Sequence, residues 1–172
     1  MSLQIILCVE ANRRSETDNI YIKETINRFY TYGNDIKLSF INMDGKTKYN
    51  SKSVERQVSQ LIKDYRIGNT VVVYCIDLDS YESNPDQVKE NMAIKEYVEK
   101  RNYDLIWFCH DVEEVYCGES VDKGVKTKTA VDFKVKNMIA NVEEKRLKAK
   151  KEAKGVSNIL NVLDKYLDRN ND

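Results

Sequence analysis

The sequence of 172 residues lacks the features that mark membrane and secreted proteins. No apolar run approaches the about 18 residues that a membrane-spanning helix needs, and no signal peptide is recognisable. Its four cysteines, Cys8, Cys75, Cys109 and Cys117, form no CxxC pair. Free thiols, buried where they lie in apolar runs, are the simplest interpretation. We therefore expect a cytoplasmic protein that does not contact a membrane.

The formal net charge is zero, because the 28 basic and 28 acidic residues balance each other. The two signs are unevenly distributed, however. Residues 1–122 contain 15 basic and 21 acidic residues, whereas residues 123–154 contain 11 basic and 4 acidic residues. An acidic body is thus followed by a basic arm. We predict an α/β core over residues 1–122 and a basic helical extension, packed on that core, over residues 123–172.

What the sequence does contain is a set of apolar, β-branched runs. They predict strands at residues 3–9, 36–43, 70–76 and 103–109. The valine-rich run VVVYCIDLD at residues 71–79 is typical of a strand buried on both faces of a parallel sheet. Amphipathic segments between the runs predict helices, so the chain alternates strand and helix. We predict a Rossmann-like α/β fold with about four parallel strands in the order 2-1-3-4, flanked by helices.

The C-terminal part carries two further amphipathic segments. One predicted helix covers residues 129–154, and a second covers residues 156–167 with apolar residues at i, i+3, i+4 and i+7. Together they predict a C-terminal helical hairpin. The apolar stripe of the second helix must dock on something, so a homo-oligomer or a partner protein is a candidate occupant of its surface.

Acidic residues stand at the ends of three predicted strands. Glu10 follows the first strand, Asp77 and Asp79 end the third, and Asp111 follows the fourth. In the predicted order the first and third strands are neighbours, so their acids should meet at the carboxyl edge of the sheet, where α/β proteins bind ligands. Carboxylates held this close repel unless a cation joins them. The pattern predicts a site for Mg²⁺ or Mn²⁺ at Asp77 and Asp79. The alternative is that this Asp-x-Asp pair only caps the following helix.

Other charged residues are candidates for auxiliary roles. Glu113 and Glu114, just beyond the fourth strand, are candidate additional metal ligands, and solvation is the alternative for both. His110 is the single histidine and is a candidate for substrate binding. The basic arm is suited to attracting a phosphate backbone without reading sequence, although it is also consistent with a solvated helix face. Its candidate substrate-binding residues are Lys145, Arg146, Lys148 and Lys151.

An acid after the first strand followed by Asp-x-Asp after the third resembles the Toprim domain of topoisomerases, primases and several nucleases. The resemblance implies acid–base chemistry for Glu10 and Mg²⁺ binding for Asp77 and Asp79. It therefore implies metal-dependent hydrolysis of phosphodiester bonds in RNA or DNA. The family usually has glycine after the glutamate, where this chain has Ala11.

Residues 15–18 (SETD) with Tyr21 resemble, more narrowly, the acidic loop of RloB-like and related defence-associated Toprim proteins. That resemblance implies a nuclease in phage defence, although residues 109–111 (CHD) replace the usual Ser-Asn-Pro. Two alternatives remain. One is a catalytically inactive Toprim-like interaction module. The other is a receiver-like phosphoacceptor domain, for which the chain has a single acid after its first strand and no evident fifth strand.

Overall fold

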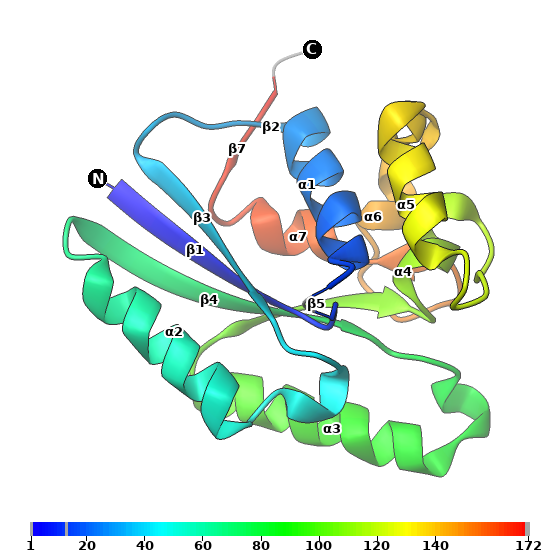
Figure 1. Ribbon diagram of the computed structural model, residues 1–172, viewed down its shortest axis with the longest axis horizontal. Helices are drawn as coiled ribbons and strands as arrows, with labels where there is room; N and C mark the ends of the chain where they lie inside the picture. The colour runs from blue at the N-terminus through cyan, green and yellow to red at the C-terminus, as the bar shows by residue number, and fades with distance from the viewer. Residues whose placement is uncertain (1, 13, 171–172) are drawn as a thin grey trace.

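A mostly parallel sheet forms the centre of the protein (Figure 1). The computed structural model describes residues 2–12 and 14–170. The strands lie in the order β3-β1-β4-β5-β6. Their bounds are β1 Ser2–Val9, β3 Ile36–Asn42, β4 Gly68–Asp77, β5 Asp104–Cys109 and β6 Val156–Ser157. The first four are parallel to one another, and β6 is antiparallel to β5.

Helices cover both faces of the sheet, so the strands are apolar on both sides (Figure 1). One face packs against α2 (Lys52–Asp64) and α3 (Pro85–Lys100). The other packs against α1 (Thr17–Phe29), α4 (Val112–Cys117), α5 (Lys126–Val135) and α7 (Ile159–Leu163). In β4, Val73 and Cys75 face the second group, and Tyr74 and Ile76 face the first. This two-sided burial explains the unbroken apolar runs.

The predicted strands and intervening helices are confirmed, with ends shifted by a few residues. Ser51 caps α2 by accepting from the Val54 N–H at 3.3 Å, and Asn84 caps α3 just before Pro85. The sheet differs from the predicted one in its fifth strand, β6. Two short elements, η1 (Lys46–Lys48) and η2 (Tyr81–Ser83), lie in the loops that follow β3 and β4.

The predicted C-terminal helical hairpin is wrong. In place of one helix over residues 129–154 the chain forms α5, then η3 (Met138–Asn141) and α6 (Glu144–Leu147). Asn137 adopts a left-handed conformation at φ 49°, which ends helical continuity after α5. In place of a helix from residue 156 the chain forms β6 and the short α7.

Asn158 explains why the last predicted helix begins late. Its side chain accepts from the Trp107 N–H and donates to the Leu105 carbonyl, both at 2.9 Å, so it continues the pairing along β5. The apolar stripe that follows is buried in the core together with residues of β1 and α1. Its docking surface is therefore the protein's own sheet, and residues 1–122 and 123–170 share one hydrophobic core.

The last strand of the chain pairs at the periphery. β7 (Asp168–Arg169) is antiparallel to β2 (Tyr30–Thr31), which follows α1 directly. Within the described residues, none of the helices has both the length and the apolar character needed to cross a membrane.

Candidate metal centre

Glu10 and Asp77 meet at the carboxyl ends of the neighbouring strands β1 and β4. Glu10 Oε2 accepts a hydrogen bond from the Asp77 backbone N–H at 3.1 Å. Asp77 is 8 % exposed, and both residues line a cavity of about 470 Å³. The parallel register pairs Val9 with Cys75, so Glu10 follows β1 at the level where β4 approaches its end at Asp77. The predicted approach of Glu10 to Asp77 is therefore present in the structure.

Two further carboxylates surround this pair. Asp18 lies in the first turn of α1 and lines the same cavity. Glu113, in the first turn of α4, is fully buried. Glu113 Oε2 accepts from Lys126 Nζ at 2.8 Å, but no described residue donates to its Oε1. A buried carboxylate oxygen without a donor is costly, and a cation offers one way to satisfy it.

The pKa values report the crowding of negative charge. Burial raises the pKa of Glu10 to about 7, against the pull of Lys46 and with the added repulsion of Asp18 and Asp79. Burial and repulsion from Glu113 raise the pKa of Asp18 to about 6. The pKa of Asp77 is raised well above its usual range, first by burial and then by the charge of Glu10. Each carboxylate thus makes its neighbours harder to ionise.

Asp79 lies apart from this pair. β4 ends at Asp77, and Asp79 adopts a left-handed conformation at φ 54°, so the two side chains are not related by a continuing strand. Its Oδ2 instead contacts Lys46 Nζ at 2.5 Å. Lys46 is 4 % exposed and also donates to the Asp77 carbonyl at 2.9 Å. Asp79 lines a separate cavity of about 340 Å³ together with His110.

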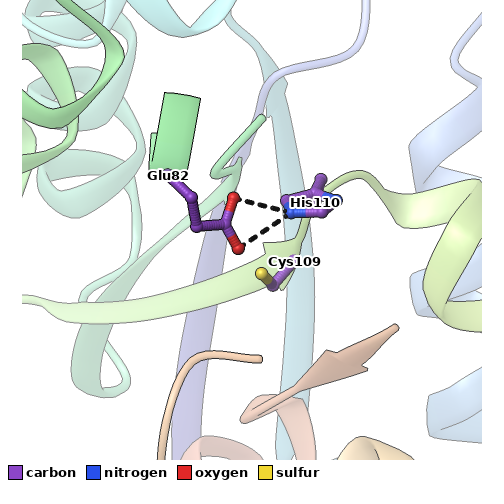
Figure 2. Close-up of side chains that lie close together, drawn as sticks. All are labelled: Glu82, Cys109 and His110. Atoms are coloured by element: carbon purple, nitrogen blue, oxygen red, sulfur yellow. Dashed lines mark hydrogen bonds and ion pairs between the residues drawn. The ribbon is translucent and has the colours of Figure 1, made fainter. Parts of the chain in front are cut away.

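His110 lies between two carboxylates at the end of β5, and Figure 2 shows the contact with one of them, Glu82. Its Nδ1 is 3.0 Å from Glu114 Oε2, and its Nε2 is 2.9 Å from Glu82 Oε2. Glu114 also accepts from the His110 backbone N–H at 2.8 Å. Glu114 therefore orients the imidazole ring, whereas Glu113 faces Lys126. The two adjacent glutamates, both predicted as auxiliary ligands, have separate surroundings.

The predicted substrate-binding residues of the basic arm lie away from Glu10. Arg146 donates to the Gly155 carbonyl at 3.0 Å and to the Glu114 carbonyl at 2.9 Å, so it holds the backbone together. Lys145 pairs with Glu143, and Lys148 lies 3.7 Å from both Glu144 and Asp164. Lys151 is exposed. Among the residues that line the cavity of Glu10, the described lysines are Lys123 and Lys126.

The donor set fits a hard divalent cation. Glu10, Asp18, Asp77 and Glu113 offer carboxylate oxygens, which Mg²⁺ and Mn²⁺ prefer. In the described part of the chain, no three of these carboxylates have mutually close oxygens. Water would therefore complete the coordination, as is usual for Mg²⁺. Asp79 and Glu114, predicted as ligands, are already paired with Lys46 and His110.

Sequence reasoning did not assign three residues that matter here. Asp18 belongs to the acidic segment at residues 15–18, and its place in the first turn of the helix that follows the first strand is a usable signal. Lys126 belongs to a basic segment, and nothing in the sequence of that segment indicates that it pairs with a buried carboxylate. Lys46 is part of a polar loop, and its burial comes from contacts with β4 and α3, including Asn91 at 3.2 Å.

Protein-family profiles, curated proteins and solved structures give no match to this chain. The assignment of a function therefore depends on the site itself and on physical argument.

Proposed function

We propose that this protein is a metal-dependent hydrolase of phosphodiester bonds in nucleic acid, of the Toprim type. The observation that carries the proposal is that Glu10, Asp18 and Asp77 line one cavity at the carboxyl ends of β1 and β4, with the buried Glu113 near enough to raise the pKa of Asp77. Burying this many carboxylates destabilises the fold unless a cation offsets them. Selection for such a costly arrangement is typical of functional sites.

The roles of the side chains follow from their surroundings. Mg²⁺ or Mn²⁺ bound here would stabilise negative charge on a phosphoryl group and acidify a bound water. Glu10, whose carboxylate lies against the backbone N–H of Asp77 at the edge of this site, is the general acid or base. Lys123 and Lys126 lie on the cavity wall and attract the phosphates that the acidic edge repels.

The substrate is nucleic acid, because a metal centre flanked by lysines is suited to a polyanion. Lys145, Lys148 and Lys151 remain candidates for distal phosphate contacts. A role in phage defence follows only from the resemblance of residues 15–18 and stays a prediction.

The test is a nuclease assay with Mn²⁺ on tRNA, single-stranded DNA and duplex DNA. Wild type, Glu10→Gln and Asp77→Asn are compared with Glu99→Gln, an exposed control on α3. We expect cleavage of at least one substrate by wild type and the control, and a loss of at least about a hundredfold in both site variants. Equal cleavage by all four proteins would identify a contaminant. Absence of cleavage together with intact Mn²⁺ binding would favour the interaction module.

A further inference from the structure

Three potential ligands of a softer metal converge where β5 meets the loop after β4. They are the carboxylate of Glu82, the thiol of Cys109 and the imidazole of His110 (Figure 2). Their ligand atoms all lie within 4.8 Å of one another. Among the described residues, this is the one group of three or more such side chains with that spacing. We propose that it is a Zn²⁺ site, separate from the carboxylate centre at Glu10.

The imidazole of His110 is held as metal-bound histidines are held. A histidine ligand usually donates its second ring N–H to a carboxylate, which fixes the tautomer and the ring orientation. Here Glu114 Oε2 lies 3.0 Å from Nδ1, and the Glu114 side chain is 6 % exposed. The same oxygen accepts from the His110 backbone N–H at 2.8 Å. Nε2 is thereby directed toward Glu82.

The carboxylates of Glu114 and Glu82 lie on opposite sides of the imidazole ring, which favours a cation at Nε2. In the tautomer whose Nδ1–H is donated to Glu114, a neutral ring presents a lone pair at Nε2. Glu82 places both carboxylate oxygens against that nitrogen, at 3.1 and 2.9 Å. Two acceptors facing each other need either a second proton on the ring or a metal between them. The sulfur of Cys109, below the Glu82 carboxylate in Figure 2, favours the metal, because it adds a third ligand atom within 4.8 Å of the other two.

The donor set selects the metal. One sulfur, one nitrogen and one oxygen suit Zn²⁺, which binds thiolate, imidazole and carboxylate in tetrahedral geometry. Mg²⁺ prefers oxygen ligands and would not compete here. Binding releases the Cys109 thiol proton to solvent and leaves the fourth position to water. The metal ion can enter the site from solvent on the side of Glu82, whose side chain is 51 % exposed.

The consequence of this site is mechanical. Glu82 belongs to η2, in the loop that also contains Asp79, whereas Cys109 and His110 end β5 and begin the next loop. One backbone hydrogen bond already joins the two segments, from the Asp79 N–H to the His110 carbonyl at 2.8 Å. Bound Zn²⁺ clamps the Asp79 loop to the end of β5, beside the cavity that Asp79 and His110 share.

The test uses Co²⁺ as a spectroscopic substitute for Zn²⁺ in the full chain, stripped with a chelator and kept reduced. In wild type the intense visible bands of tetrahedral cobalt and a thiolate-to-cobalt charge-transfer band are expected to correspond to one equivalent of Co²⁺. Zn²⁺ should abolish both signals at one equivalent, and a large excess of Mg²⁺ should not.

Variants assign the ligands. Cys109→Ser should lose the charge-transfer band, and Glu82→Gln should bind Co²⁺ at least about tenfold more weakly. Glu82 is exposed, so its variant remains informative if Cys109→Ser fails to fold. Cys117→Ser and Glu99→Gln are matched controls that should keep the full spectrum, as should Asp77→Asn, whose metal centre is separate. Absence of tetrahedral bands in wild type would overturn the proposal, as would bands unchanged in Glu82→Gln.

Discussion

The side chain of Glu10 accepts a hydrogen bond from the backbone N–H of Asp77 at 3.1 Å, which fixes the two acids at the ends of adjacent parallel strands. This single contact joins residues 67 positions apart in sequence. It keeps the Glu10 carboxylate beside Asp77 despite their mutual repulsion, which raises the pKa of Asp77 after the larger effect of burial. The carboxylate cluster is therefore part of the folded architecture.

Stability of the metal-free protein should fall as pH rises through this cluster. The pKa of Glu10 rises from 4.5 to about 7 on folding, and that of Asp18 from 3.8 to about 6. The folded state then binds more protons than the unfolded state in this range, so the free energy of unfolding decreases with pH from about pH 4 to about pH 7. Thermal denaturation in a chelator measures the decline.

Glu10→Gln removes one contributor to this decline. Its loss of stability between pH 5 and pH 8 should be smaller than that of wild type by about 1–3 kcal/mol. Glu99→Gln should follow wild type. Mn²⁺ should restore stability to wild type at the higher pH. Identical pH profiles for wild type and Glu10→Gln would contradict the raised pKa of Glu10.

Lys126 is expected to stabilise the fold through Glu113. Its Nζ lies 2.8 Å from the buried Glu113 Oε2, and Lys126→Met leaves that carboxylate without its cation. Urea denaturation in a chelator should show a loss of about 3 kcal/mol or more. Lys128→Met, on the same helix and exposed, should cost less than about 0.5 kcal/mol. Adding Glu113→Gln to Lys126→Met should recover most of the loss, and purely additive effects would show that the pair is not coupled.

Lys46 is expected to hold the Asp79 loop. It is buried and contacts oxygens of Asp79, Gln87 and Asn91. Lys46→Met leaves these acceptors without their donor and should destabilise the protein by about 2–4 kcal/mol in urea denaturation. Lys48→Met is the matched exposed control, two residues along the chain, and should be nearly neutral. An equal loss of stability in the two variants would show that the contacts of Lys46 do not stabilise the Asp79 loop.

The lysines of the cavity should matter more for cleavage than those of the basic arm. Lys123 lines the cavity of Glu10 and is exposed, so Lys123→Ala should weaken nucleic-acid cleavage about threefold at low salt by removing one phosphate contact. Lys151→Ala, an equally exposed substitution outside the cavity, should have a smaller effect. KM and kcat measured against salt concentration distinguish the two. If Lys151→Ala weakens cleavage more than Lys123→Ala does, the basic arm, and not the cavity, binds the substrate.

The sequence allowed the central sheet to be predicted because its strands are buried on both faces and leave unbroken apolar runs. The approach of Glu10 to Asp77 was also predictable, since parallel strands end at a common edge. The position of Asp79 was not, because a single left-handed residue after β4 turns its side chain toward Lys46. Burial of Lys46 depends on contacts from three separate segments, which no local pattern records.

The C-terminal part was the least predictable. Its apolar residues recur at helical spacing, yet the helix stops at Val135 and the chain reaches the sheet through a strand of only two residues. Asn158 decides this path through hydrogen bonds to β5, and a single polar side chain gives no periodic signal. Arg146 was predicted to bind substrate because it lies in the basic arm, although its partners are backbone carbonyls that lie close only after folding.

The most direct test of the metal centre is isothermal titration of Mn²⁺ into the chelator-treated protein. Wild type and Glu99→Gln should bind Mn²⁺, whereas Asp77→Asn should bind it at least about tenfold more weakly because it lacks a central carboxylate ligand. Circular dichroism must show all three proteins folded. Mn²⁺ binding of equal strength in Asp77→Asn, or no binding in wild type, would contradict the carboxylate centre and with it the proposed phosphodiester chemistry.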